Sequence, residues 1–149
     1  MKIERVDHLH VSAPDFDKFV DEFKKIMGRE FTAPDMDMQH YGTIVTYEPY
    51  PIGIELFKAY DAERSVSSRL AASSRGVFAV SYKVPDIQEA RKELEELGYK
   101  EIEYYDFGPI KEALYDTDDK FGFNLELIEY AGEDIQEVAD PDVTEELLG

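Results

Sequence analysis

Four side chains that can bind a metal ion fall on short, strand-like segments of this sequence. His8 and His10 lie two residues apart in one apolar run, and Glu55 and Glu126 each stand between two apolar residues. Because alternate residues of a strand point to opposite faces, each polar side chain projects away from its apolar neighbours. A carboxylate in such a position is costly unless it is solvated, paired with a cation or bound to a metal. The pattern indicates a shared face that carries imidazole and carboxylate groups.

The elements that must position these groups occur twice. Pro14-Asp15 and Pro85-Asp86 each end a β-favouring run and precede an amphipathic helical pattern. The two dipeptides are 71 residues apart, which is also the spacing between Glu55 and Glu126. A spacing that is the same at two distant points indicates an internal repeat. We therefore predict two halves with the same fold.

Each half is predicted to form a strand, a helix and further strands. The helices are expected to begin after the capping residues Asp15 and Asp86 and to close at Gly28 and Gly98. Later strands are expected at 38–50, 52–58, 101–107, 111–116 and 121–130. This predicts a single domain at 1–131, built from βαβββ modules at about 3–58 and 76–130 that a linker joins at 59–75. Residues 132–149 are expected to form an acidic tail, either loosely packed or a short helix on the domain or on a partner.

Composition narrows the classes of partner. The chain has 34 Asp and Glu against 16 Lys and Arg, a formal net charge of −18. Such a charge repels a phosphate backbone, so we expect no nucleic-acid binding; it serves solubility or attracts a cationic ligand. No apolar run approaches the ~18 residues that span a bilayer, and no signal peptide is evident, so we expect no membrane partner and a cytoplasmic location. Because cysteine is absent, a bound metal must use His, Asp, Glu or water.

These motifs resemble those of the vicinal oxygen chelate (glyoxalase/bleomycin-resistance/dioxygenase) superfamily. The resemblance rests on Asp7-His8 in the first strand, the two Pro-Asp helix entries and the ending Asn124-Leu125-Glu126-Leu127-Ile128-Glu129, and it covers about residues 3–130. Methylmalonyl-CoA epimerases and glyoxalase-type members are most similar. The resemblance implies an α+β fold in which two βαβββ modules form a cupped mixed sheet with the helices on the outer face.

The resemblance also implies a metal site. Members take one ligand from the first and one from the fourth strand of each module, which gives His8, Glu55 and Glu126 as ligands of a divalent Fe, Mn, Co, Ni or Zn ion. The fourth expected position is Ala79, which cannot coordinate a metal. Three protein ligands still leave a coordination position open for chemistry. His10 could replace the missing ligand, bind substrate or serve packing alone, and both glutamates could instead be solvated.

The reaction implied is that of a metal-dependent isomerase, epimerase or lyase. Its substrate would be a small oxygenated or carbonyl compound, converted through an enolate-like intermediate. The candidates for the catalytic base are Glu126, Glu55 and Glu48. The candidates for substrate binding, whose alternative role is packing within the sheet, are His10, Tyr47, Tyr105 and Tyr115.

Two other functions stay open. Ala79 and the acidic charge favour a metal-free protein that sequesters a cationic antibiotic. A non-haem iron dioxygenase ranks lower, because its site usually needs two histidines and a carboxylate, and the second module lacks its histidine. An exposed sheet edge would permit a homodimer.

Overall fold

The computed structural model describes residues 1–13, 15–31 and 36–138. The first half contains β1 (Arg5–Ser12), α1 (Phe16–Met27), β2 (Met36–Met38), β3 (Thr43–Glu48) and β4 (Ile54–Ala59). The second half contains β5 (Gly76–Lys83), α3 (Ile87–Glu96), β6 (Glu101–Asp106), β7 (Lys111–Tyr115) and β8 (Asn124–Glu129). The predicted pair of βαβββ modules is confirmed. Helix α2 (Val66–Ser73) lies between the modules, α4 (Asp118–Phe121) lies within the second module between β7 and β8, and a short 3-10 helix, Ile135–Glu137, follows β8.

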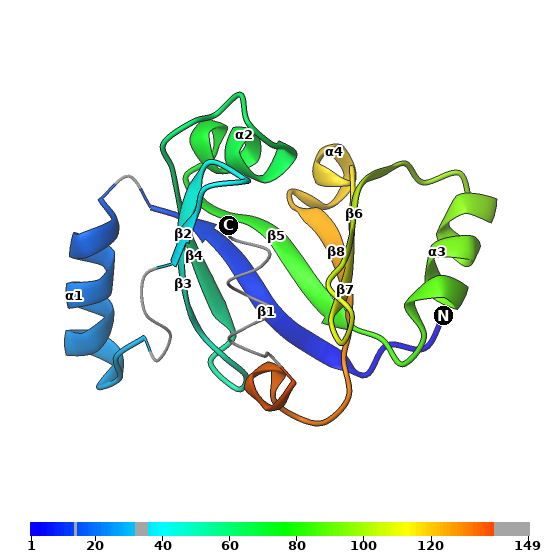
Figure 1. Cartoon of the computed structure of the whole chain (residues 1–149), viewed down its shortest axis with the longest axis horizontal. Coiled ribbons are helices and arrows are strands. Elements are labelled where there is room, and N and C mark those ends of the chain that lie inside the picture. Colours follow the sequence, from blue (N-terminus) through cyan, green and yellow to red (C-terminus); the bar gives the residue numbers. More distant parts are fainter. Residues whose placement is uncertain (14, 32–35, 139–149) are drawn as a thin grey trace.

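All strands join one mixed sheet in the order β2-β3-β4-β1-β5-β8-β7-β6. The first strands of the two modules, β1 and β5, pair antiparallel at the centre, and each pairs in parallel with the last strand of its own module. The order is therefore the same when it is read outwards from either side of the centre. Figure 1 shows the sheet curled, with α1 and α3 outside it at opposite ends of the molecule.

Helices α1 and α3 begin where their capping residues predict. The carboxylate of Asp15 accepts a hydrogen bond from the backbone N–H of Lys18, and that of Asp86 accepts one from Glu89, each at 3.0 Å. Such caps satisfy backbone donors that a first helical turn leaves free. Helix α1 ends at Gly28, whose φ of 67° lies in the left-handed region that glycine adopts without strain.

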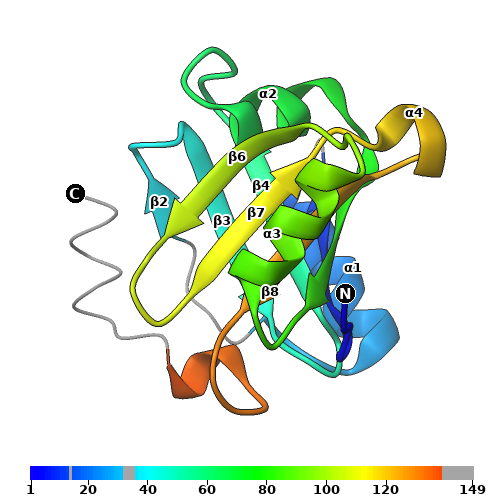
Figure 2. The same cartoon turned by 90° about the vertical axis from the view of Figure 1, so that its right-hand side faces the viewer.

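The apolar faces of both modules point outwards, onto the helices. Val11 and Leu56 pack with Phe16 of α1, and Leu127 packs with Ile87 and Leu94 of α3. Figure 2 shows α3 lying over β7 and β8. Since strand residues alternate between faces, this packing turns the intervening polar residues of β1, β4 and β8 towards the concave side.

Helix α2 lies within residues 59–75, the segment predicted to link the two modules. Ser65 and Ser68 form a capping box that starts α2, and Ser68 and Ala71 are buried. The hydroxyl of Ser12 donates to the carbonyl oxygen of Ala71 at 2.5 Å, which fixes α2 against β1. Small residues make the buried face of this helix, so its sequence lacks the large apolar stripe that marks the other two long helices.

Two strand boundaries also differ from the prediction. The segment 38–50 holds the end of β2, a turn and β3, because the chain reverses at Gly42. Residues 118–121 form the one-turn helix α4, so β8 begins only at Asn124. Pro14 and the tail residues 139–149 lie outside the described residues. Among the residues that the structure describes, no helix combines the length and apolar character needed to cross a membrane.

Candidate metal centre

A cavity of about 220 Å³ opens on the concave side of the sheet. Side chains from β1, β3, β4, β6, β7 and β8 line it, and α2 and the 3-10 helix each add residues. Four of the residues predicted to do chemistry meet at this wall: His8, His10, Glu55 and Glu126. All four line the same cavity, as the alternation of residues along their strands predicts.

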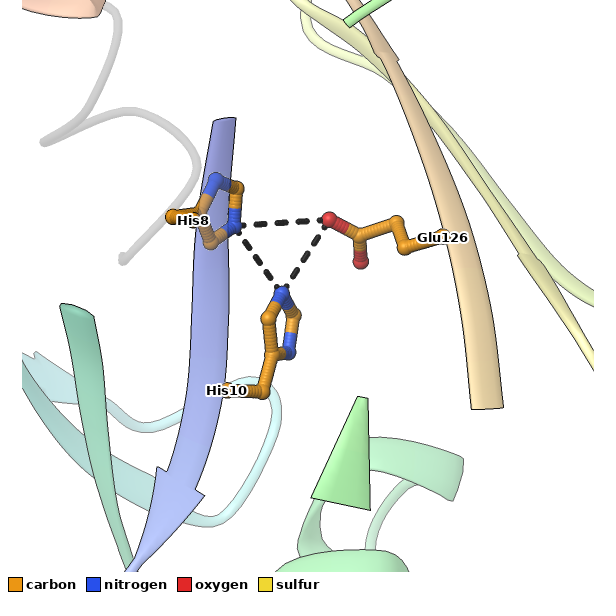
Figure 3. Close-up of side chains that lie close together, drawn as sticks. All are labelled: His8, His10 and Glu126. Carbon is orange, nitrogen blue, oxygen red and sulfur yellow. Dashed lines mark hydrogen bonds and ion pairs between the residues drawn. The ribbon is translucent and has the colours of Figure 1, made fainter. Parts of the chain in front are cut away.

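His8, His10 and Glu126 form a tight triangle in the cavity wall (Figure 3). The two Nε2 atoms are 3.0 Å apart, and Oε1 of Glu126 lies 3.1 Å from Nε2 of His10 and 3.5 Å from Nε2 of His8. All three residues are buried. Two strands that neighbour the same central strand, β1 and β8, thus bring together groups 116 residues apart.

The triangle suits a divalent ion of the size of zinc or iron. Nitrogen and oxygen ligands about 2.0–2.2 Å from such an ion, at tetrahedral or octahedral angles, stand about 3.0–3.5 Å from one another. The distances among His8, His10 and Glu126 fall within this range. Two imidazoles and a carboxylate are also a donor set that Zn, Fe, Co, Ni and Mn accept.

A buried hydroxyl beside the triangle also supports a metal ion at this site. Ser81 of β5 lies between His8 and Glu126 in the sheet register, so its side chain faces the same side as theirs. Its Oγ is fully buried and has no hydrogen-bond partner among the described residues. An orphaned buried hydroxyl is unfavourable, and a hydrated ion in the triangle would satisfy it.

Asp7 orients His8 from behind. Nδ1 of His8 lies 2.9 Å from Oδ2 of Asp7, and Oδ1 of Asp7 accepts hydrogen bonds from Tyr130 and Arg5. A carboxylate on the far nitrogen fixes the tautomer and the ring direction of a metal-binding histidine. Nε2 of His8 is therefore the atom aimed at the cavity. Burial favours the neutral His8 ring, but the carboxylates of Asp7, Glu126 and Glu55 outweigh it and hold its pKa well above the usual value.

A β-bulge lets Asp7 reach this position. Val6 pairs with Tyr82 and His8 pairs with Ser81, so Asp7 is an extra residue on β1. The neighbouring Gly53 has a φ of 65°, and a Cβ there would lie 2.6 Å from the backbone oxygen of Asp7. Only glycine leaves room for the bulge. Strict alternation predicts Asp7 on the opposite face from His8, so this contact could not be predicted from the Asp-His pair alone.

Aromatic packing holds His10. Its ring stacks on His8 with centroids 4.9 Å apart and on Phe57 at 5.0 Å, and the edge of Phe78 contacts it at 5.7 Å. Ala79, the residue opposite His10 on β5, is fully buried. A second imidazole therefore comes from β1 itself, while the small side chain of Ala79 leaves room for that ring.

The three carboxylates considered as bases differ in their surroundings. Burial alone would raise the pKa of Glu126, but the imidazoles of His10 and His8 outweigh it and lower this pKa. Glu55 lies at the edge of the triangle, with Oε2 3.2 Å from Nε2 of His8 and with 26% of its side chain exposed. Glu48 is buried and forms an ion pair with Arg29.

The tyrosines predicted to bind substrate divide into two groups. Tyr47 and Tyr105 line the cavity. Tyr115 does not: it is buried in the core between the sheet and α3, where its hydroxyl donates to Glu101 at 3.1 Å. The proposal of Tyr115 as a substrate-binding residue is therefore wrong. Glu112 of β7 lines the cavity, and residues three apart on a strand point to opposite faces, so Tyr115 faces α3.

A further acidic residue, not predicted from the sequence, lies in the cavity wall. Glu112 of β7 lines the cavity on the strand next to β8, which carries Glu126. It pairs with Tyr105 on β6, so the two side chains share a face. Burial and the negative charges of Glu126 and Glu55 raise the pKa of Glu112 well above its usual range. The alternation of β7 marks Glu112 as inward-facing once the face of Tyr115 is known.

Neither the family models nor the curated proteins include a match to this chain. Solved structures do. The methylmalonyl-CoA epimerase of Streptomyces coelicolor, solved with 2-nitronate-propionyl-CoA, is 17% identical over 88% of this chain and 100% of its own, with a TM-score of 0.67. The epimerase of Mycobacterium tuberculosis is 17% identical, covers 92% and 93% and has a TM-score of 0.67. A hypothetical protein of Bacillus halodurans is 16% identical, covers 87% and 96% and has a TM-score of 0.70.

The chain shares its architecture with these structures. It has the fold of the vicinal oxygen chelate superfamily, a curled mixed sheet built from two βαβββ modules. The fold implied by the sequence resemblance is thus confirmed. At this level of identity the similarity shows the fold alone.

Proposed function

We propose that this chain is a metal-dependent isomerase or epimerase that moves a proton at a carbon atom next to a carbonyl group. The observation that carries the proposal is the triangle of His8, His10 and Glu126 with a second carboxylate, Glu55, at its edge. Structural neighbours described as methylmalonyl-CoA epimerases support the same class of reaction.

In this proposal His8, His10 and Glu126 hold the ion. Their donor atoms lie at suitable separations, and Asp7 fixes the ring of His8. A bound divalent ion supplies Lewis-acid chemistry, which stabilises negative charge developing on a substrate oxygen. The low pKa of Glu126 suits a ligand, because a ligating carboxylate must be ionised.

Glu55 is the carboxylate best placed to act as the base. Its side chain is partly exposed to the cavity, whereas Glu126 is held by both imidazoles and Glu48 is paired with Arg29. A base must reach the proton that it removes, and a carboxylate at the edge of the triangle can approach the carbon beside the carbonyl group of a substrate in the cavity. The proton held by Glu55 can return to a neighbouring carbon of the substrate, which completes an isomerisation, whereas an epimerisation requires a second acid on the opposite face of the same carbon.

The other walls orient the substrate and exclude water. Tyr47 and Phe57 lie on β3 and β4 beside the triangle, and Tyr105 and Phe107 stack at 5.6 Å on the opposite side. Apolar walls with a few polar groups are typical of small-molecule sites. Exclusion of water strengthens the electrostatic effect of the charged groups.

Solvent exchange tests this proposal directly. The metal-loaded protein would be incubated in D2O with a panel of small carbonyl compounds and thioesters, and proton NMR would follow loss of the signal beside the carbonyl. We expect exchange that a chelator abolishes and that Glu55→Gln slows by about 100-fold or more, with the metal content unchanged. Exchange that survives Glu55→Gln at the wild-type rate would exclude Glu55 as the base, and absence of exchange across the panel would contradict the proposal.

One observation favours a second candidate, a non-haem iron dioxygenase. Two histidines and one carboxylate form the usual ligand set of such enzymes. The lack of a histidine in the second module counted against this function, but His10 supplies the second imidazole from β1. Anaerobic loading with Fe(II), followed by measurement of oxygen uptake with catechols, separates the two candidates. Oxygen consumption without proton exchange would favour the dioxygenase.

A further inference from the structure

The cavity wall is acidic and lacks basic side chains. Five carboxylates line it, together with two imidazoles, and no lysine or arginine is among the described residues that do so. A substrate that carries phosphate or carboxylate groups would find no lysine or arginine among the described residues of this wall. The charge of the wall instead favours a ligand with a positive charge.

Four of the five carboxylates already have cationic partners. Asp7 is paired with Arg5 and with His8, and Glu48 is paired with Arg29. Glu55 and Glu126 face the imidazoles of the triangle, where a bound ion would also balance their charge.

Glu112 is the exception. Among the described residues it makes no hydrogen bond or ion pair, although it is partly buried in the wall. Its pKa is raised by burial and by the charges of Glu126 and Glu55, as expected for a carboxyl group that lacks a cation. A positive charge placed beside it would reverse this effect.

Two tyrosines of the cavity wall lie near Glu112. Tyr105 is its direct partner on the neighbouring strand, and the ring of Tyr41 contacts that of Tyr105 edge-on, with centroids 5.6 Å apart. Both tyrosines line the cavity, and the negative charge of Glu112 contributes to the raised pKa of Tyr41. Aromatic faces beside a carboxylate are the usual surroundings of bound ammonium groups.

We propose that Glu112, Tyr41 and Tyr105 form a subsite for a cationic group of the substrate, an ammonium or quaternary ammonium. The subsite shares the cavity with the metal triangle, and β7, which carries Glu112, pairs with β8, which carries Glu126. One substrate would therefore carry both a positive charge and the reacting carbonyl group. The statement about the reacting carbonyl group rests on the proposed function. The ligand class differs from the CoA esters named for the structural neighbours.

A pair of probes of the same shape tests the subsite. Choline and 3,3-dimethylbutan-1-ol differ in the positive charge, so calorimetric titration of each into the full chain isolates the effect of charge. We expect choline to bind at least about 10-fold more tightly than the alcohol, as cation–π and carboxylate contacts predict. Propionyl-CoA serves as the anionic probe and is expected to bind more weakly than choline.

Three variants complete the test. Glu112→Gln should weaken choline binding about 10-fold and leave the alcohol unaffected. Tyr105→Leu, which keeps an apolar side chain, should weaken choline alone by about 3- to 10-fold. Glu22→Gln, on the exposed surface of α1, removes the same charge far from the cavity and should change nothing. Circular dichroism would verify that each variant folds.

The proposal is overturned if the alcohol binds as tightly as choline, if propionyl-CoA binds more tightly, or if Glu112→Gln and Tyr105→Leu fold but bind choline like the wild type. All titrations would be run both on metal-loaded and on chelator-treated protein. Choline binding in the chelator-treated protein therefore supports the subsite even where no proton exchange is found, and proton exchange without choline binding supports the enzyme but not the subsite.

Discussion

The carboxylate of Asp7 lies 2.9 Å from Nδ1 of His8, although the two residues are adjacent on one strand. In a regular strand they would point to opposite faces. The bulge at Asp7 brings both to the concave side, so the carboxylate that orients the ring and the ring itself come from one short stretch of chain. The local irregularity of β1 is therefore part of the site.

Asp7→Asn should weaken binding of a divalent ion about 10- to 100-fold, because an amide orients the ring less firmly and adds no negative charge. Competition with a chelating dye would measure this change. Asp37→Asn is the matched control, since Asp37 lies on β2 and accepts a hydrogen bond from Tyr60. Equal affinities of Asp7→Asn and wild type would show that Asp7 does not support the site.

Ala79→His should not create an additional ligand. Ala79 is fully buried in a cluster with Phe57, Phe78 and Leu114, and the ring of His10 already occupies the space opposite. We expect the variant to lose about 1–3 kcal/mol of unfolding free energy through overpacking, with no gain in metal affinity. Urea denaturation measures the first effect, and Ala72→His on the exposed face of α2 controls for the residue type. Tighter metal binding in a stable Ala79→His protein would show that position 79 can supply a ligand, against this prediction.

Glu112→Gln should stabilise the protein at high pH. The pKa of Glu112 is raised on folding, so its contribution to stability is fully present below the unfolded pKa, about 4.3, and is lost as the pH rises through the folded pKa. Glutamine stays neutral and avoids this loss. Thermal denaturation should show a melting temperature a few degrees above wild type at about pH 8 and little difference at about pH 4. The opposite order at the higher pH would contradict the assigned environment of Glu112.

Asp86→Ala should weaken the fold but leave the site intact. Its carboxylate caps α3 on the outer face, and loss of such a cap costs about 1 kcal/mol. Chemical denaturation gives the stability, and a metal titration of the folded variant should match wild type. A change in metal affinity would mean that α3 is coupled to the triangle, which the packing does not indicate.

The sequence alone predicted the groups that meet in the cavity. The period of a strand decides which face a residue occupies, and the repeat at a spacing of 71 residues indicates which strands are equivalent. The strand period and the repeat together predict that His8, His10, Glu55 and Glu126 share one face. The capping aspartates likewise predicted α1 and α3.

Features that break local periodicity could not be predicted. The bulge at Asp7 depends on the close approach of Gly53, a contact between two strands. Helix α2 depends on small residues fitting against β1, and the location of Tyr115 depends on the register of β7 with β8. The cytoplasmic location, the homodimer and the division into residues 1–131 and 132–149 stay predictions.

The metal content of the purified chain tests the central claim most directly. After loading with Mn, Fe, Co, Ni or Zn in turn and dialysis, elemental analysis should find about one ion per chain in the wild type for at least one metal. A variant carrying His8→Ala and Glu126→Ala should retain almost none while keeping its circular dichroism spectrum. A wild-type chain that retains no metal under any loading, or a folded double variant that retains as much as wild type, would contradict the account.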